Sequence, residues 1–340
     1  MTDWMRLGVL AVVASATVIA VGGTGSVTTA GAASECSRVV APGGSDGGPG
    51  TESSPFRTVR KLVASLKRGQ TGCLRAGAYH QNVKVSSAAT ALRSYPGERA
   101  RLVGRLWIAR SAVGTRITGL DLDGTNSARL PGPTVNAPGV VFEDNDVTNG
   151  HRAESCFLLG SSQYGRADRV VIRRNRIHDC GRLPAANHDH GIYAAKASGG
   201  LIAGNLIYDN ADRGVQLYPD ADRFVVTGNV IDGNGQGVIF SGDGGRASSS
   251  NRVQGNIITN SRLRFNVESY WPRGNPVGTG NVAERNCLWN GARGGAQGVQ
   301  SPSVGFSSRA NVVGDPRYLD RRQKDFRLAP DSPCRSVLAP

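Results

Sequence analysis

The sequence has 340 residues, a formal net charge of +14 at pH 7 and 46 glycines, whereas aromatic residues make up only 6% of it. A strongly basic chain favours a polyanionic partner. The sequence contains no basic strip interleaved with aromatic residues and no nucleic-acid-binding module, so we expect acidic polysaccharide and not nucleic acid. The alternative is that the arginines only decorate solvated turns. None of the six cysteines has the spacing of a metal site.

The N-terminal residues predict a secretory signal peptide over residues 1–33. An apolar stretch of 15 residues, 7–21, is followed by small residues in which Ala30 and Ala32 have Ala-x-Ala spacing. The stretch is shorter than the roughly 20 residues that span a membrane, although an uncleaved anchor is the alternative. We therefore expect a secreted protein with no membrane association after cleavage.

An exported chain is expected to form disulfides. Fifteen pairings of six cysteines are formally open. The simplest one joins neighbours in the sequence: Cys36 with Cys73, Cys156 with Cys180, and Cys287 with Cys334.

Residues 34–81 predict an N-terminal strand, a loop and a capping helix that ends near Leu66. The apolar side chains of that helix fall on one face, which suits a cap over the open end of a repeat structure. These side chains are Phe56, Val59, Leu62, Val63 and Leu66.

A repeated asparagine dominates the following residues. Each copy stands between two apolar pairs, and the intervals are 24 to 30 residues: Asn145, Asn175, Asn205, Asn229, Asn256 and Asn286. Such a period is typical of a solenoid whose units bury their apolar faces against one another. Asparagine tolerates left-handed backbone and can stack as a ladder in parallel β-structure. The pattern predicts a right-handed parallel β-helix, in which Leu120 takes the asparagine position of an earlier coil.

A second series of strands lies between the asparagines. Alternation places one set of its side chains inward: Ile192, Ala194, Val215, Leu217, Val238, Phe240, Phe265 and Val267. The same alternation places another set outward: Tyr193, Gln216, Tyr218, Ser241, Asn266 and Glu268, with Ile239 as an apolar exception. We expect one all-β domain of about eight coils over residues 82–300, a C-terminal tail over 301–340 packed on it, and a monomer.

The segment 39–83 carries a family resemblance. Its Pro55-Phe56-Arg57-Thr58 step, predicted helix and Gly77-Ala78-Tyr79 turn resemble the lead segment of exported β-helix proteins related to polysaccharide lyases. Together with the asparagine coils, the resemblance to this pectate-lyase-like superfamily covers nearly all of the mature chain. It implies the fold more narrowly than the reaction, because lyases, mannuronan C5-epimerases, hydrolases and non-catalytic surface proteins share this body. The polygalacturonase pattern of paired aspartates, Gly-His-Gly and Arg-x-Lys is missing, which disfavours the hydrolases.

The densest polar segment, NHDHGIY at 187–193, predicts the site. The next coil repeats it as NADRGVQLY at 210–218, so that Asp189 stacks on Asp212 and His190 on Arg213. Tyr193 stacks on Gln216, with Tyr218 one step along and Lys196 at the end of the first strand. We expect a groove on the outer face of the β-helix.

This inventory suits β-elimination at a uronate, which needs a cation on the carboxylate, a base for the adjacent proton and an acid for the leaving oxygen. Arg213 is the predicted carboxylate clamp. His190 or Lys196 is the predicted base, and Tyr193 or Tyr218 is predicted to act as base or acid.

The remaining predicted site residues bind the sugar or a metal ion. Predicted sugar contacts are His188, Gln216, Tyr218, Glu268, Tyr270 and Trp271. Lyases of this fold often use calcium, and the stacked Asp189 and Asp212 offer oxygen ligands for it.

Other interpretations stay open. The histidines and aspartates can be corner residues that bond backbone amides, and Arg213 can pair with Asp189 or Asp212. A uronan C5-epimerase is one alternative function; its Asp-x-His step is met here only as His188-x-His190. A non-catalytic glycan-binding or cell-surface protein is the other.

Overall fold

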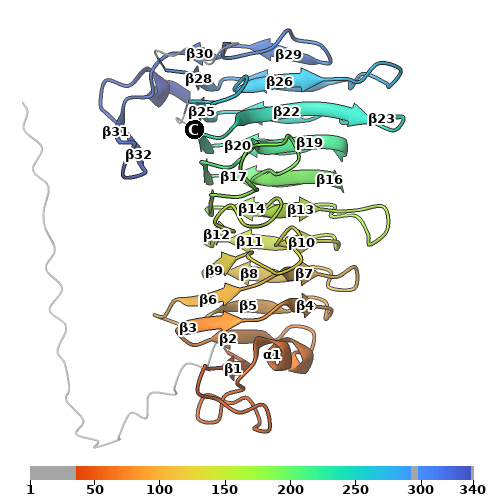
Figure 1. The fold of residues 1–340 in the computed structure, drawn as a ribbon, viewed down its shortest axis with the longest axis vertical. Helices are drawn as coiled ribbons and strands as arrows, with labels where there is room; N and C mark the ends of the chain where they lie inside the picture. Colours follow the sequence, from red (N-terminus) through yellow and green to blue (C-terminus); the bar gives the residue numbers. More distant parts are fainter. Residues whose placement is uncertain (1–35, 292–297, 338–340) are drawn as a thin grey trace, which may run out of the picture. The chain divides into compact units, whose positions relative to one another are not determined.

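The computed structural model describes residues 36–291 and 298–337, and the predicted signal peptide lies outside them. Three long sheets run through this body, and the strands within each pair in parallel with the next coil (Figure 1). Among the named strands of the described residues, only β22–β23 and β31–β32 pair antiparallel. The predicted all-β parallel solenoid is confirmed.

Among the described residues, sheet A has eleven strands, and eight of them lie within residues 82–300, where about eight coils were predicted. In spatial order they are β1 (Arg38–Val40), β2 (Thr71–Leu74), β5 (Ala91–Ser94), β8 (Arg116–Thr118), β11 (Val141–Glu143), β14 (Val171–Arg173), β17 (Leu201–Ala203), β20 (Val225–Thr227), β24 (Arg252–Gln254), β27 (Asn281–Glu284) and β29 (Phe306–Arg309).

Sheet B follows sheet A in each coil. Its strands are β3 (Gly77–His80), β6 (Ala100–Val103), β9 (Leu120–Asp123), β12 (Asp146–Thr148), β15 (Arg176–His178), β18 (Leu206–Tyr208), β21 (Val230–Asp232), β25 (Ile257–Thr259), β28 (Cys287–Trp289) and β30 (Val312–Val313).

Sheet C forms the third side. Its strands are β4 (Val83–Val85), β7 (Leu106–Ile108), β10 (Thr134–Val135), β13 (Phe157–Leu159), β16 (Ile192–Ser198), β19 (Arg213–Asp222), β22 (Gln236–Asp243), β23 (Arg246–Ala247) and β26 (Val267–Tyr270), the last paired with β22. Its strands are longest at β16, β19 and β22, where the site was predicted.

The one α-helix in the described part of the chain, α1 (Val59–Ser65), closes the N-terminal end. The side chain of Thr58 caps it by accepting a hydrogen bond from the Lys61 amide. Val59, Leu62 and Leu66 are buried and belong to the same apolar cluster as the coil interior. The predicted capping helix is confirmed. No helix among the described residues is long and apolar enough to cross a membrane.

The asparagine ladder joins sheet A to sheet B at the corner between them. The backbone N–H of Asn145 donates to the Asn175 side-chain oxygen at 3.0 Å, and the Asn145 side-chain NH₂ donates to the Ile117 carbonyl one coil back. The same pattern continues as far as Asn311, which sequence analysis missed. Leu120 donates its backbone N–H to Asn145, as its predicted place in the ladder requires.

The left-handed residue of each corner is the one before the asparagine. Asp144, Arg174, Gly204 and Gly228 all have positive φ, whereas the ladder asparagines do not. The asparagines are therefore selected by their buried hydrogen bonds and not by their backbone conformation.

The interior is filled as alternation predicts, with one local correction. The predicted inward residues of β16, β19 and β22 are fully buried. Phe265 lies before β26 and is only half-buried, whereas Asn266 is buried because its side chain bonds Ser261 and Trp289.

The C-terminal residues add further coils and a hairpin that packs on sheet B. The coils continue through β29 and β30, beyond the predicted limit at residue 300. The hairpin of β31 (Tyr318–Asp320) and β32 (Asp325–Leu328) then lies against sheet B, with Phe326 against Tyr208 and Arg321 paired to Asp232 at 2.7 Å. A short 3₁₀-helix, η1 (Pro333–Val337), carries Cys334. All three predicted disulfides are confirmed.

Replacing one asparagine of the ladder tests how much the ladder contributes to the free energy of unfolding. Asn205→Ala leaves the Asn175 backbone amide and the Ile172 carbonyl without their partners in a dry interior. We expect a loss of about 3 kcal/mol or more in unfolding free energy, measured by urea titration. Asn275→Ala, which removes one exposed bond to Gly245, is the matched control and should cost under about 1 kcal/mol. Equal losses in the two variants would contradict the ladder's role.

A histidine on sheet B predicts a pH dependence of stability. Burial alone would lower the pKa of His178, but its bonds to Asp146 at 2.9 Å and Asp179 at 2.7 Å outweigh burial and raise the pKa to about 9. Because the folded pKa exceeds the unfolded value near 6.5, the stabilisation is complete below about pH 6.5 and is lost as pH rises through 9. The difference in melting temperature between wild type and His178→Gln should therefore shrink from pH 6 to pH 10. His80→Gln, an exposed histidine on β3, should show no such trend.

Candidate functional site

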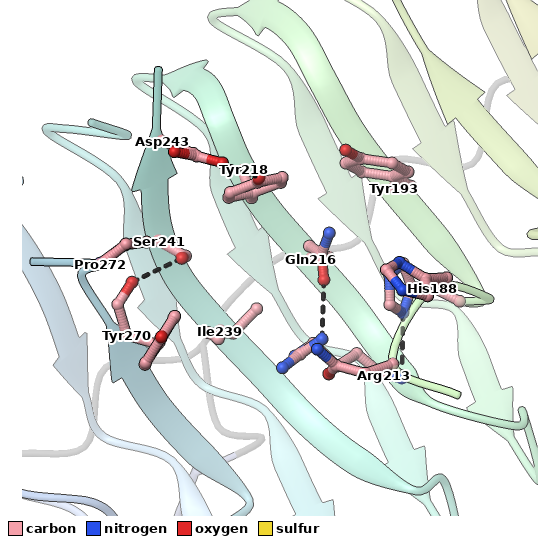
Figure 2. Close-up of a pocket in the computed structure, with 12 residues that line it drawn as sticks. His188, Tyr193, Arg213, Gln216, Tyr218, Ile239, Ser241, Asp243, Tyr270 and Pro272 are labelled. Atoms are coloured by element: carbon pink, nitrogen blue, oxygen red, sulfur yellow. Dashed lines mark hydrogen bonds between the residues drawn. The ribbon is translucent and has the colours of Figure 1, made fainter. Parts of the chain in front are cut away.

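A cleft of about 210 Å³ opens on the outer face of sheet C, across β16, β19, β22 and β26 (Figure 2). We call it the sheet C cleft. It is smaller than the roughly 300–1,000 Å³ of enclosed small-molecule pockets, which suits part of an extended ligand. Its lining residues are Asn187, His188, His190, Tyr193, Arg213, Gln216, Tyr218, Ile239, Ser241, Asp243, Tyr270 and Pro272.

Strand register brings these side chains together. Tyr193 pairs with Gln216, and Gln216 pairs with Ile239, so the three stack outward on successive coils as predicted. Gly191 and Gly214 allow the close approach, because a Cβ on Gly191 would lie 2.8 Å from the Gly214 carbonyl oxygen. Ile239, the apolar residue at a predicted outward position, forms part of the floor of the cleft.

Arg213 lies on the floor and is only 4% exposed. Its Nη1 donates to Gln216 Oε1 at 2.9 Å and its Nε to Glu268 Oε1 at 3.3 Å (Figure 2 shows the first). Burial lowers the pKa of Arg213, but a guanidinium stays charged throughout the physiological range. Neither Asp189 nor Asp212 pairs with it; its carboxylate partner is Glu268, so the floor of the cleft carries a guanidinium held in an ion pair.

Glu268 lies beneath the cleft and not on its surface. Its side chain is fully buried between Arg213 and Arg264, with Arg264 Nε 3.0 Å from Oε2. Burial raises the pKa of Glu268, and the two arginines oppose that rise. The predicted sugar contact by Glu268 is wrong, because Arg264 covers this outward position of the strand. Glu268 instead holds the Arg213 guanidinium in place.

His190 lines the cleft with a fully buried ring. Its Nδ1 accepts the backbone N–H of Arg213 at 3.3 Å, which assigns the ring proton to Nε2. Nε2 is buried without a protein partner. Burial, assisted by the charge on Arg213, holds the pKa of His190 well below its usual range. A neutral ring with its lone pair already bonded does not suit the predicted role of base.

Two tyrosines form the opposite wall. The rings of Tyr193 and Tyr218 stack with centroids 6.2 Å apart. Burial raises the pKa of Tyr193 to about 12, and burial together with the Asp243 carboxylate raises that of Tyr218, whose hydroxyl donates to Asp243 at 3.0 Å. Both phenols are therefore protonated at neutral pH and can donate a proton.

The rim carries His188 and Tyr270. The His188 side chain is exposed, while its backbone N–H is held by Asp212 Oδ2 at 2.8 Å. Tyr270 is 56% exposed, and its carbonyl accepts from Ser241 at 2.5 Å. Both lie where the sequence predicted ligand contacts.

The predicted calcium ligands do not fit a shared ion. Asp212 Oδ2 accepts the backbone N–H groups of His188 and Asp189. Asp189 pairs with Arg182 Nε at 2.6 Å, so a cation already occupies that carboxylate. Among the described residues, no group of three or more His, Cys, Asp or Glu is arranged to hold a metal.

Two predicted site residues lie outside the cleft. The register between β16 and β19 shifts after Ala194, and Lys196 points to Ser162 in a neighbouring cleft of about 220 Å³. Trp271 donates its indole N–H to the Val304 carbonyl at 2.8 Å and packs against the core. Conversely, Asp243 was missed, because its bond to Tyr218 crosses 25 residues and leaves no sequence signal.

The buried ion pair under the cleft predicts a large loss on truncation. Glu268→Ala leaves Arg213 charged and without its carboxylate in the interior, which should cost about 3–5 kcal/mol of unfolding free energy. Asp331→Ala, which breaks the exposed pair with Arg317, should cost about 1 kcal/mol or less. Denaturant unfolding of both variants checks this, and a Glu268 loss as small as the control would show that the pair is not structural.

Comparison with known structures shows the same architecture. A structure of the pectate lyase Pel9A has a TM-score of 0.61 at 13% identity and covers 88% of this chain and 90% of that one. The complex of XylC with xylose has a TM-score of 0.58 at 12% identity, covering 81% and 68%. A rhamnogalacturonan lyase has a TM-score of 0.53 at 14% identity, covering 83% and 90%. Identities this low show the fold alone.

Sequence comparison adds a relative and a family. An uncharacterized protein, YwoF of Bacillus subtilis (strain 168), is 26% identical over 229 residues, which are 63% of this chain and 46% of the relative; this chain thus spans about half of the relative's length. The family model described as a right handed beta helix region matches residues 118–293, more than half of the chain. The match confirms the predicted hand of the solenoid, and the chain belongs to the right-handed β-helix family.

Proposed function

We propose that this is an exported carbohydrate-active protein that binds an acidic polysaccharide in the sheet C cleft and cleaves it by β-elimination. The observation that carries the proposal is the floor of the cleft. There the cleft is lined by Arg213, whose guanidinium is buried, and by His190, whose Nε2 has no protein partner. A buried guanidinium and an unused hydrogen-bond donor in one cleft are complementary to a carboxylate.

The residues divide into roles that fit elimination. Arg213 and His190 hold the uronate carboxylate and stabilise the negative charge that develops on it. His188 on the rim takes the proton from the carbon next to the carboxylate, because its side chain is exposed and an imidazole can act as a general base. The carbanion's electron pair forms the new C=C bond, and the glycosidic C–O bond at the next carbon breaks. The phenol of Tyr193 or Tyr218 protonates the leaving oxygen.

Three residues have roles here that differ from those the sequence predicted. His188 moves from sugar contact to base, because its side chain is exposed at the rim of the cleft. His190 moves from base to carboxylate donor, because its Nδ1 lone pair is bonded to the chain. Lys196 loses its role as base, because it lies in the neighbouring cleft. Solved β-helix structures that include a pectate lyase and a rhamnogalacturonan lyase support an acidic polysaccharide as the class of ligand.

The assay follows the unsaturated product. Purified protein is incubated with polygalacturonate, alginate and other uronate polymers, with calcium and then with chelator, and ultraviolet absorbance is recorded. Rising absorbance on one polymer supports the lyase. Hydrogen exchange from solvent into an intact polymer, with no absorbance, would make it an epimerase. Retention on a polymer with neither signal would make it a binding protein.

One substitution tests the assigned base. His188→Ala should reduce turnover by about 10²- to 10⁴-fold and leave the melting temperature and polymer binding unchanged, because the side chain is exposed and its backbone N–H stays bonded to Asp212. His80→Ala, an exposed histidine on sheet B, is the control and should keep full activity. Full activity in His188→Ala would overturn its role as base.

A further inference from the structure

We propose a second anion-binding subsite on sheet C, made by Lys84, Arg105, Trp107 and Tyr164, which receives a distant carboxylate of the same polymer chain. We call these four residues the distal cluster. The inference rests on the proposed function and extends it, because it sets the length and charge pattern of the ligand.

The distal cluster is built around one indole. Lys84 Nζ lies 4.5 Å and Arg105 Cζ 5.4 Å from the centre of the Trp107 ring, and Tyr164 meets the ring edge-on at 5.5 Å. The indole N–H donates to Asn136 Oδ1 at 2.8 Å, which fixes the ring. Lys84 and Tyr164 are exposed. The cluster therefore presents two cations and aromatic surface to solvent in a fixed arrangement.

Its cations have no carboxylate partner. Within residues 36–291 and 298–337, neither Lys84 nor Arg105 makes an ion pair, and Arg105 donates instead to the Thr134 hydroxyl and the Pro131 carbonyl. Farther along this side of the solenoid, Arg166 and Arg246 both pair with Asp220. An anionic ligand is the group that this arrangement lacks.

Strand register connects the distal cluster to the sheet C cleft. One outward column runs through successive coils, from Lys84 through Trp107, Thr134, Leu158 and Tyr193 to Gln216. Figure 1 shows the strands of this column, β4, β7, β10, β13, β16 and β19, stacked in order. Leu158 and Tyr193 also line the neighbouring cleft that contains Lys196. That cleft lies between the distal cluster and the sheet C cleft. A polymer that lies along this column passes from one subsite to the other.

The spacing defines the ligand. Trp107 on β7 and Arg213 on β19 are four coils apart, about 19 Å at roughly 4.8 Å per coil. One pyranose residue is comparable in length to one coil, so carboxylates at both subsites belong to sugars about four residues apart. The ligand is therefore an extended polyuronate of at least about five residues, and a dimer fills the sheet C cleft alone.

The test compares binding of short and long ligands. Affinities of oligogalacturonates and oligomannuronates of two to eight residues are measured by calorimetry for the full-length protein, Lys84→Gln and Tyr164→Ala. Lys67→Gln, an exposed lysine just after α1, is the matched control for loss of one positive charge. We expect Lys84→Gln to weaken hexamer binding about tenfold and to leave dimer binding unchanged. Tyr164→Ala should also weaken hexamer binding, and Lys67→Gln should change neither affinity.

The outcomes separate the two proposals. Wild-type affinity that stops rising at two or three residues, or equal effects of Lys84→Gln and Lys67→Gln on the hexamer, overturns the distal subsite while leaving the sheet C cleft as a uronate site. Binding of no oligomer by the wild type overturns the proposed function and the distal subsite with it.

Discussion

The hydrogen bond from one asparagine to the next holds the coils between Leu120 and Asn311 in register. Each corner between sheets A and B buries backbone groups that water cannot reach, and a missing partner there costs about 1–3 kcal/mol. The Asn205 side chain accepts from the Asn175 backbone and donates to the Ile172 carbonyl and to Asn229. One amide thus ties together three coils. A coil shifted by one residue would break these bonds and turn its apolar face outward.

The sheet C cleft depends on that register. Tyr193, Gln216 and Ile239 face the same side only because β16, β19 and β22 are aligned residue by residue. The same alignment sets the backbone N–H of Arg213 against Nδ1 of His190, which fixes the ring as a donor. A feature of the coil backbone therefore decides the chemistry of a side chain in the cleft. Glu268, one strand farther on, completes the arrangement by holding the guanidinium in place.

The sequence predicted most of the fold and part of the site. The asparagine frames and the stacking of Tyr193 on Gln216 follow from short patterns that repeat from coil to coil, and the disulfides join cysteines that are neighbours in the sequence. The roles of His190, Lys196 and Glu268 did not follow, for three separate reasons. A tautomer depends on a bond across coils, a register shift after Ala194 redirects Lys196, and Arg264 covers a position that alternation alone would leave exposed.

The sequence alone determined the period, the inward and outward faces, and which residues could meet on neighbouring coils, because in a parallel stack these depend on residue spacing within one repeat. Tertiary structure alone decided which outward side chains reach solvent and which ionise or donate, because those properties depend on contacts between residues tens of positions apart. Lys84 and Trp107 belong to this second group. Nothing in their local sequence connects them to Tyr193, and only the stacking of β4, β7, β10, β13 and β16 places all three in one column.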